Sequence, residues 1–330
     1  MKAWLLESLG GFKKLKLGEI ADPVVGLGEI LLRVKYAALN PADRYLSEGQ
    51  YPARPPLPHI LGRDGIGEVI GIGGGVPAGL WNEGDSALIL RSEIGVTRAG
   101  TLAEKVAVPA ESLAKVPRGW TDQQAAAGPL VYLTAYQALN NFGELPPPVV
   151  VLVSGASGGV GVASIHLGKA MGHRVIGLSR GTAKRDALIK QGAEAIFDPT
   201  EATWRKKLRE YLGEKKVDLA IDNVGGEMFN DIIDTLGNNG RVSVVGRLAG
   251  PVPQFNTASL LFRRLTIRGV VIASYTPTES QSVWSAVVTM LNAAGVHPLV
   301  DSVHPFDKLM DAFEKLKQGP LGKVLVEGPK

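Results

Sequence analysis

The sequence predicts an α/β protein in which a doubly wound parallel sheet is inserted into a β-rich region. Three observations predict it. An apolar run over residues 149–153 is followed at once by a cluster of glycines. Helix-like and strand-like segments then alternate to about residue 245. Before residue 117 the chain instead holds short strand-like runs separated by Gly and Pro. Alternation is typical of a parallel sheet, and short strands between turns are typical of a partly closed barrel.

The stretch Val149–Gly161 reads VVVLVSGASGGVG and predicts a strand, a tight turn and the start of a helix. Gly158 and Gly161 take the last two places of the pattern G-x-G-x-x-G, and Ala156 takes the first. Such a turn brings backbone N–H groups and the positive end of a helix to one point, which suits a pyrophosphate. We therefore predict dinucleotide binding at this turn, by Ser157, Gly158, Gly159 and Val160.

The strand expected at residues 174–179 indicates which dinucleotide binds. A site for NADH usually has an Asp or Glu there, which binds the ribose 2′-hydroxyl. This chain has Ser179 and Arg180 at that place, with Lys184 and Arg185 just beyond. Cationic side chains favour the 2′-phosphate of NADPH. The alternative is that Lys184 and Arg185 only solvate the next helix, but the missing acid still favours NADPH.

Composition narrows the possible partners. The chain has 330 residues, which suits two domains, and a formal net charge of only +4 without a Lys/Arg-rich block. We therefore expect no nucleic acid partner. No apolar run approaches the length of a membrane span and no secretory signal is evident, so we expect no membrane partner and a cytoplasmic location. The chain has no cysteine, which excludes disulfides and cysteine-bound zinc.

We expect residues 1–120 to form the β-rich domain, residues 121–266 to form the dinucleotide-binding domain, and residues 267–330 to return to the first domain. The proline-rich stretch Asn40–Leu61 is expected to be a long functional loop outside the core. Thr121–Phe142 is expected to be one helix with Thr121 as its N-cap. In the first domain, short strands are expected at 3–6, 29–37, 65–71, 85–90 and 103–108.

After the glycine turn the expected elements alternate. Helices are expected at 162–172, 182–191, 201–212 and 227–236, and strands at 174–179, 195–197, 217–221, 241–245 and 265–272. Helices are also expected at 278–294 and 307–316, before a last strand at 322–326. Because this last segment resembles the β-rich region more than the parallel sheet, we expect it to pack in the first domain.

Short phrases along nearly the whole chain resemble the medium-chain dehydrogenase/reductases. They are LNPAD at 39–43, GRDGIGEV at 62–69, LTAY at 133–136, DNVGG at 222–226 and GKV at 322–324. Their order and spacing are most similar to the zinc-independent quinone oxidoreductase branch. This resemblance implies a Rossmann domain inserted into a GroES-like catalytic domain, with NADPH as cofactor. It also implies a homodimer, formed by edge-to-edge pairing of the strand at 265–272.

The zinc-dependent alcohol dehydrogenases of this superfamily bind catalytic zinc through Cys, His and Cys. The resemblance places these three positions at Asn40, Arg63 and Leu130, none of which is a good zinc ligand. We therefore expect no metal, and without a Lewis acid alcohol oxidation is disfavoured. Hydride transfer from NADPH to an already electrophilic acceptor remains possible. The sequence therefore favours reduction of a quinone or of an activated alkene such as an enone or enal.

The catalytic candidates are Tyr51, Asn40 and Arg63. Tyr51 lies where the similar 2-enoyl thioester reductases have a tyrosine acid, so its hydroxyl can protonate an enolate or only line the pocket. Asn40 can donate its amide N–H to the substrate oxygen, a role that the resemblance supports, or fix the turn before Pro41. Arg63 can pair with Asp64 in a salt bridge that shapes the pocket, or supply the positive charge of the missing metal.

Further cofactor contacts are expected at the C-terminal ends of the parallel strands, where open α/β sheets bind ligands. Thr134 resembles a family residue near the nicotinamide ribose. The other cofactor-binding candidates are Asn223, Val224, Gly246, Arg247, Ile272 and Lys323. For Val224 and Ile272, core packing is the alternative. Two alternative functions stay open, which are a 2-enoyl thioester reductase and a non-catalytic NADPH-binding protein.

Overall fold

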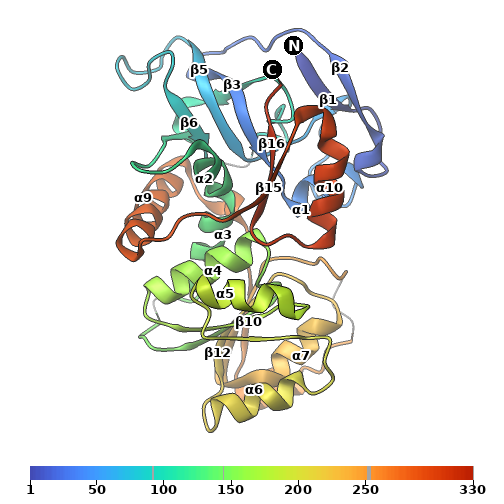
Figure 1. Ribbon diagram of the computed structural model, residues 1–330, viewed down its shortest axis with the longest axis vertical. Coiled ribbons are helices and arrows are strands. Elements are labelled where there is room, and N and C mark those ends of the chain that lie inside the picture. Colours follow the sequence, from blue (N-terminus) through green and yellow to red (C-terminus); the bar gives the residue numbers. More distant parts are fainter. Residues whose placement is uncertain (91–92, 144, 251–253, 330) are drawn as a thin grey trace. The chain divides into compact units, whose positions relative to one another are not determined.

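Two separate groups of strands organise the chain in the computed structural model, which describes residues 1–90, 93–143, 145–250 and 254–329 (Figure 1). The first unit comprises Met1–Leu130, Ile272–Ala286 and His297–Lys330. The second unit comprises Val131–Val271 and Val287–Val296. The second unit is therefore inserted into the first, as the fold class predicted from the sequence requires.

A six-stranded parallel sheet lies at the centre of the second unit, in the order β11–β10–β9–β12–β13–β14. Its strands are β9 (Val150–Val153), β10 (Arg174–Leu178), β11 (Ala195–Phe197), β12 (Val217–Asp222), β13 (Leu236–Val244) and β14 (Thr266–Gly269). The chain runs outward from β9 in both directions, so the predicted doubly wound sheet is confirmed. All four residues of β9 are buried, as expected of a strand that is covered on both faces.

Helices precede and connect the strands of this sheet (Figure 1). They are α3 (Pro129–Asn140), α4 (Gly159–Ala170), α5 (Arg185–Lys190), α6 (Trp204–Leu212), α7 (Glu227–Thr235) and α8 (Ala258–Arg263), and α9 (Pro277–Ala294) contributes residues to both units. On α6, Trp204, Leu208 and Leu212 recur at helical spacing and are buried in the core of the sheet, whereas the residues between them are mostly charged. This amphipathic pattern explains why the segment forms a surface helix.

The first unit holds two further sheets, a three-stranded one in the order β2–β1–β4 and a seven-stranded one in the order β15–β16–β3–β5–β6–β8, with β7 paired to β3. The strands are β1 (Lys2–Leu6), β2 (Leu15–Glu19), β3 (Glu29–Ala38), β4 (His59–Ile60), β5 (Gly65–Ile72), β6 (Ser86–Ile89), β7 (Lys105–Pro109), β8 (Leu113–Lys115), β15 (Val300–His304) and β16 (Lys323–Glu327). The helices are α1 (Pro41–Ser47), α2 (Asp122–Ala127) and α10 (Leu309–Gln318).

The C-terminal segment packs in the first unit. Strand β16 pairs antiparallel with β3, with Val326 opposite Ala37. Phe313 of α10 stacks on Phe12, with the ring centroids 4.9 Å apart, and both rings are buried. Residues near both ends of the chain therefore pack in one core in the first unit.

The single helix expected from Thr121 to Phe142 is wrong, because the structure divides it into α2 and α3 at Gly128 and Pro129. A proline has no N–H to continue a helical ladder, so a new helix begins with it. The predicted N-cap is confirmed. The Thr121 hydroxyl accepts a hydrogen bond from the Gln124 N–H at 3.2 Å, and the Gln124 side chain returns one to the Thr121 N–H at 2.9 Å.

The stretch Asn40–Leu61 is not a loop outside the core, so this expectation is also wrong. It contains the helix α1 and the short strand β4, and Leu46, Ser47 and Leu61 are buried. The helix begins at Pro41, a residue suited to the first helical position, and the Asp43 carboxylate accepts a hydrogen bond from the Asn40 N–H at 2.8 Å.

The segment after residue 266 departs from the expected division. Strand β14 pairs parallel with β13 and so belongs to the sheet of the second unit, and residues 287–296 also cluster there. The strand expected at 265–272 ends at Gly269, and Ile272–Ser274 form a 3₁₀ turn. At the other boundary the first unit extends to Leu130 rather than to residue 120.

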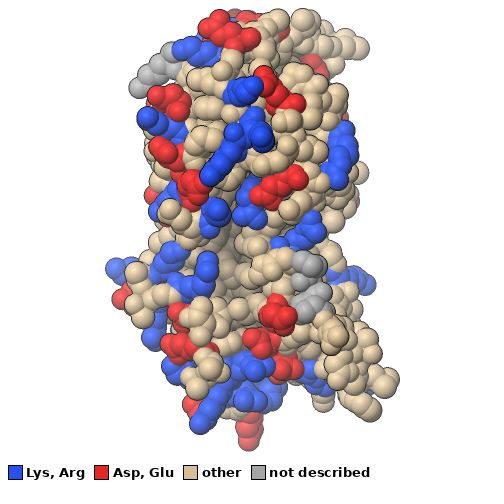
Figure 2. Space-filling model, turned by 90° about the vertical axis from the view of Figure 1, so that its right-hand side faces the viewer, with Lys and Arg blue, Asp and Glu red and all other residues tan. Residues whose placement is uncertain are grey.

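Acidic and basic side chains lie interspersed on the face shown in Figure 2, in agreement with the small net charge. None of the helices that the structure describes is both long and apolar enough to cross a membrane.

Candidate functional site

The glycine turn after β9 is held in shape by close backbone contacts. A Cβ atom on Gly161 would lie 2.4 Å from the carbonyl oxygen of Gly155 and 2.6 Å from Ala156, so no larger residue fits there. A Cβ atom on Gly158 would meet the same oxygen at 3.5 Å, an ordinary contact. Since α4 begins at Gly159, its first backbone N–H groups have no partners within the helix and are available to a phosphate.

A buried hydrogen-bond network joins this turn to the end of β12. Ser154 donates from its hydroxyl to Asp222 Oδ1 at 2.7 Å and accepts from the Asn223 N–H at 2.9 Å. The Asp222 carboxylate also accepts from the N–H groups of Val224 and Gly225, both at 3.0 Å. The network fixes the backbone of Asn223 and Val224 at the carboxyl end of the sheet, beside the glycine turn, where the sequence predicts cofactor contacts.

The residues that follow β13 lie at the same edge of the sheet. A Cβ atom on Gly246 would lie 2.5 Å from the carbonyl oxygen of Asn223, so glycine is required for this approach. Arg247, which follows it, is exposed. Among the expected cofactor-binding residues, the structure thus brings Asn223, Val224 and Gly246 together beside the glycine turn.

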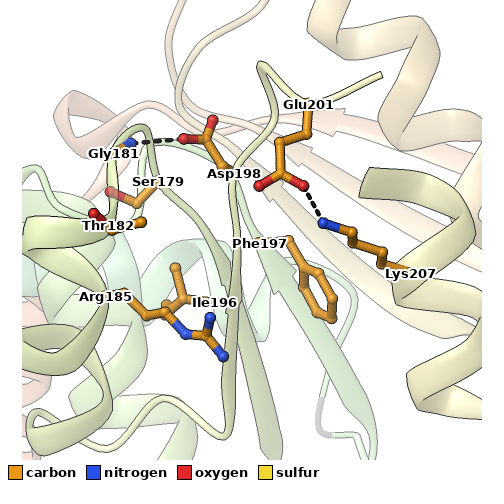
Figure 3. Close-up of a pocket in the computed structure, with 9 residues that line it drawn as sticks. All are labelled: Ser179, Gly181, Thr182, Arg185, Ile196, Phe197, Asp198, Glu201 and Lys207. Atoms are coloured by element: carbon orange, nitrogen blue, oxygen red, sulfur yellow. Dashed lines mark hydrogen bonds and ion pairs between the residues drawn. The ribbon is translucent and has the colours of Figure 1, made fainter. Parts of the chain in front are cut away.

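A pocket of about 170 Å³ lies at the ends of β10 and β11 (Figure 3). It is lined by Ser179, Gly181, Thr182, Arg185, Ile196, Phe197, Asp198, Glu201 and Lys207. Ser179 is only 5 % exposed, and its hydroxyl oxygen has no hydrogen-bond partner among the residues that the structure describes. A buried hydroxyl without a partner at the edge of a pocket is a ready contact for a polar ligand.

The acidic groups of this pocket are already engaged by the protein. Asp198 accepts hydrogen bonds from the Gly181 N–H at 2.7 Å and from the side chain and N–H of Thr200 at 2.6 and 2.9 Å. These bonds, the one from the Thr200 side chain first, lower the pKa of Asp198. Glu201 forms an ion pair with Lys207, drawn as a dashed line in Figure 3. Both carboxylates that line the pocket therefore already bind groups of the protein.

The basic residues of the pocket differ in part from those predicted. Arg185, which the sequence left between phosphate contact and solvation, lines the pocket, and so does Lys207 of α6. Arg180 is exposed and close enough to contribute to the lowered pKa of Asp198, but neither it nor Lys184 is among the lining residues. Sequence reasoning missed Lys207 because it lies on a helix outside the strand–turn–helix unit, and no local pattern marks it.

The remaining candidates fall on both units. Thr134 lies on α3, within the second unit, whereas Ile272 and Lys323 belong to the first. Ile272 is half-buried in a 3₁₀ turn rather than at the end of a strand. Cofactor binding by these three residues stays a prediction.

In the first unit, Tyr51 and Arg63 form a pair. The Arg63 guanidinium donates from Nη1 to the Tyr51 hydroxyl oxygen at 3.0 Å and lies over the Tyr51 ring, 5.4 Å from its centroid. Arg63 is only 6 % exposed, whereas Tyr51 is half-buried. Because the hydroxyl oxygen accepts this bond, its own proton remains available to another acceptor.

The expected salt bridge between Arg63 and Asp64 is wrong, because the partner of Asp64 is Lys323. The Lys323 ammonium donates to Asp64 Oδ2 at 3.1 Å, and both side chains are buried. Arg63 and Asp64 are adjacent, but their side chains engage different partners: Arg63 binds Tyr51, and Asp64 binds Lys323.

Asn40 is held by the same lysine. Its side-chain oxygen accepts from Lys323 at 2.7 Å, and its Nδ2 donates to the carbonyl oxygen of Ala38 at 3.0 Å. Lys323 also donates to the carbonyl oxygen of Leu39 at 3.0 Å, so a direct contact with a cofactor would require one of its three bonds to be given up.

Two carboxyl groups in this cluster have raised pKa values. Burial raises the pKa of Asp43 to about 6, against the charge of Arg63 and the bond from the Asn40 N–H. Burial also raises the pKa of Asp64, opposed chiefly by Lys323. The cluster therefore combines two cations with two carboxyl groups that are reluctant to ionise, in a region where charges interact strongly.

The residues at the three expected zinc positions do not suit a metal. Asn40 offers an amide whose oxygen is bound by Lys323, Arg63 is a cation, and Leu130 is apolar and buried. Within the described ranges, no three His, Cys, Asp or Glu side chains gather in a way that could hold a metal ion. The donor set therefore does not fit catalytic zinc.

Comparisons with known proteins agree with this architecture. Residues 26–118 match the family model described as the alcohol dehydrogenase GroES-like domain, and residues 159–293 match the model described as zinc-binding dehydrogenase. The human synaptic vesicle membrane protein VAT-1 homolog is 31 % identical over 352 residues, covering 100 % of this chain and 87 % of that protein. The human quinone oxidoreductase is 29 % identical over 329 residues, covering 99 % and 97 %.

Among solved structures, the quinone oxidoreductase of Escherichia coli complexed with NADPH superimposes with a TM-score of 0.89. It is 25 % identical, over 99 % of this chain and 100 % of that one. The chain thus belongs to the medium-chain dehydrogenase/reductase superfamily. Within this superfamily it belongs to the quinone oxidoreductase-like branch, as the sequence phrases predicted.

The raised pKa of Asp43 predicts a pH-dependent loss of stability. Its folded value of about 6 lies above the ordinary 3.8, so its contribution is fully present below about pH 4 and is lost as the pH rises through 6. Asp43→Asn keeps an oxygen for the Asn40 N–H and removes the charge. We expect it to exceed the wild type by on the order of 3 kcal/mol in unfolding free energy near pH 8, but not below about pH 4.

Urea denaturation at a series of pH values measures this difference. Asp186→Asn, a change at an exposed position of α5, serves as the control and is expected to follow the wild type. A difference in unfolding free energy between the Asp43 variant and the wild type that is the same at all pH values would contradict the raised pKa of Asp43.

Proposed function

We propose that the protein is an NADPH-dependent, zinc-independent oxidoreductase that transfers hydride to a quinone or to an activated alkene such as an enone or enal. The observation that carries this proposal is the hydrogen bond from Arg63 to the Tyr51 hydroxyl. The family resemblance places Arg63 where the zinc-dependent enzymes have a metal ligand. The quinone oxidoreductases among its relatives support the reaction class. The choice of a quinone or an activated alkene as substrate is our proposal.

The residues of the second unit fit NADPH as the cofactor. The glycine turn and the N-terminus of α4 suit its pyrophosphate, and the pocket at Ser179 suits its adenosine 2′-phosphate, with Arg185 and Lys207 as cations. NADPH, when bound, supplies the hydride for the reaction. The structure of a relative in complex with NADPH supports the same cofactor.

The residues of the first unit act on the oxygen of the acceptor. When hydride adds to the β-carbon of an enone, the carbon–carbon π electrons move toward the carbonyl and leave negative charge on its oxygen. The Tyr51 hydroxyl donates its proton to this oxygen, while Arg63 keeps the hydroxyl in position and places a positive charge beside it. We also propose that Asn40 donates an amide N–H to the carbonyl oxygen of the acceptor.

Tyr51→Phe tests this role. Because a positioned general acid typically contributes about 100-fold or more to rate, we expect turnover of an enone to fall by about that factor, with unchanged NADPH affinity. Steady-state kinetics and a fluorescence titration with NADPH measure the two quantities. Tyr36→Phe, which removes the hydroxyl of a half-buried tyrosine bonded to Gln123, is the matched control. Equal turnover in both variants would remove Tyr51 from the mechanism.

The basic residues of the pocket should determine the preference for NADPH. We expect Arg185→Ala to raise the Kd for NADPH by about 10-fold or more, since a bond to a charged group contributes about 1.5–3 kcal/mol, and to leave the Kd for NADH unchanged. Fluorescence titration with NADPH and with NADH measures the two Kd values. Lys190→Ala, at the exposed end of α5, is the control. An equal rise in the Kd for NADH would argue against recognition of the 2′-phosphate by Arg185.

The proposed assembly is a homodimer. Strand β14 forms one edge of the six-stranded sheet and has no partner on its outer side among the described residues, and nearby Leu261, Phe262 and Val271 are exposed. An unpaired edge beside apolar side chains favours pairing with a second copy. We expect light scattering to give a mass twice that of the 34.9 kDa chain. We expect Phe262→Asp to lower the measured mass toward that of a single chain. A wild-type monomer would reject the dimer. The cytoplasmic location expected from the sequence remains part of this proposal.

A further inference from the structure

The pocket at the ends of β10 and β11 is lined by as many carboxylates as cations. Arg185 and Lys207 are the cations, and Asp198 and Glu201 are the carboxylates. The formal charges of these four side chains therefore sum to zero. A phosphate monoester carries about 1.5–2 negative charges near neutral pH, so each lining carboxylate repels the 2′-phosphate that the two cations attract.

The two cations differ in what they already bind. Lys207 forms an ion pair with the Glu201 carboxylate, and both side chains are about half exposed (Figure 3). The Arg185 guanidinium forms no hydrogen bond or ion pair with the residues that the structure describes. A phosphate that enters the pocket can therefore bind Arg185 directly, whereas it must compete with Glu201 for Lys207.

The two carboxylates differ in what they do for the fold. Asp198 accepts hydrogen bonds from Gly181 and Thr200, so both of its oxygens hold backbone in place. The Glu201 side chain, by contrast, is bound only by Lys207 among the described residues. The charge of Glu201 can therefore be removed without loss of a bond to the backbone.

We propose that Glu201 is a specificity-determining residue that limits the preference for NADPH over NADH. It occupies Lys207 and places a negative charge beside the 2′-phosphate. NADH has a neutral hydroxyl in place of this phosphate, so the carboxylate does not repel it. This role rests on the proposed function, since it requires that NADPH places its 2′-phosphate in this pocket.

Glu201→Gln tests the role, because it removes the charge and keeps an oxygen for Lys207. Two unit charges about 4 Å apart alter an equilibrium constant by about 5-fold even in water. We expect the Kd for NADPH to fall by about 3-fold to 10-fold, and the Kd for NADH to change by less than about 2-fold. Fluorescence titration with each cofactor measures both values. Damage to the pocket would weaken binding, so a gain in affinity distinguishes the effect of charge from a structural defect.

Glu210→Gln is the matched control. Glu210 also lies on α6 and pairs with a lysine, Lys206, at 3.8 Å, but neither residue lines the pocket. We expect this variant to keep the wild-type Kd for both cofactors. An equal gain in NADPH affinity in the control variant would assign the effect to net charge and would overturn the role of Glu201.

The same titrations at two salt concentrations test whether the effect is electrostatic. The Debye length falls from about 30 Å at about 0.01 M salt to about 3 Å at about 1 M, and both side chains of the ion pair reach solvent. The ratio of the wild-type Kd for NADPH to that of Glu201→Gln should therefore fall toward one at high salt. A ratio that does not change with salt would contradict the proposal.

The titrations also separate this proposal from the proposed function. An unchanged or raised Kd for NADPH in Glu201→Gln would overturn the role of Glu201, and so would an equal fall for NADH. If Arg185→Ala still weakens NADPH alone, the 2′-phosphate site stands although the role of Glu201 fails. If the wild type binds NADPH but reduces no acceptor, the proposed reaction fails, and the Kd values still decide the role of Glu201.

Discussion

The buried ion pair between Lys323 and Asp64 is the interaction around which the polar cluster of the first unit is built. It joins the last strand of the chain to the residue before β5, across 259 positions of sequence. A buried pair of this kind contributes little net stability compared with a well-packed apolar pair, but removing one member typically costs about 3–5 kcal/mol. What the pair does show is a link between β16 and the residues that precede α1 and β5, since Lys323 binds Leu39, Asn40 and Asp64.

In the proposed reaction, the cations of the same cluster would take the place of a metal in stabilising negative charge on the acceptor. Lys323 binds Asn40 and Asp64, and Arg63 binds Tyr51, so two cations are buried close to two carboxyl groups. Cations held in a buried region stabilise developing negative charge more than they would in water. In the second unit the corresponding constraint is steric, because the contact at Gly161 brings α4 against the turn after β9.

The second unit was largely predictable from sequence because its signals are local. A buried aliphatic strand, a glycine turn and the helix that follows it are each marked by about ten residues, and strand β11 was predicted to the residue. The elements that sequence reasoning missed depend on distant partners. Helix α1 begins at the proline of an Asn-Pro pair, which usually marks a turn, and its Asp43 is buried by the rest of the unit.

The contacts among the candidate residues were not predictable from the sequence, and the roles of these residues stay predictions. Adjacency in sequence wrongly paired Arg63 with Asp64, whereas in the structure Arg63 binds Tyr51 and Asp64 binds Lys323. Lys207 escaped notice because only the folded sheet brings α6 to the pocket at Ser179. Contacts between residues far apart in sequence leave no periodic pattern by which they could be recognised.

The most direct test of the account is the rate of NADPH oxidation with a small panel of acceptors, namely a naphthoquinone, an enal, a crotonyl thioester and a ketone, each repeated with NADH. The account predicts turnover of the quinone or the enal, with a clear preference for NADPH. Turnover of the thioester alone would instead indicate a 2-enoyl thioester reductase. No turnover with any acceptor, despite measurable NADPH binding, would contradict the account and favour a non-catalytic NADPH-binding protein.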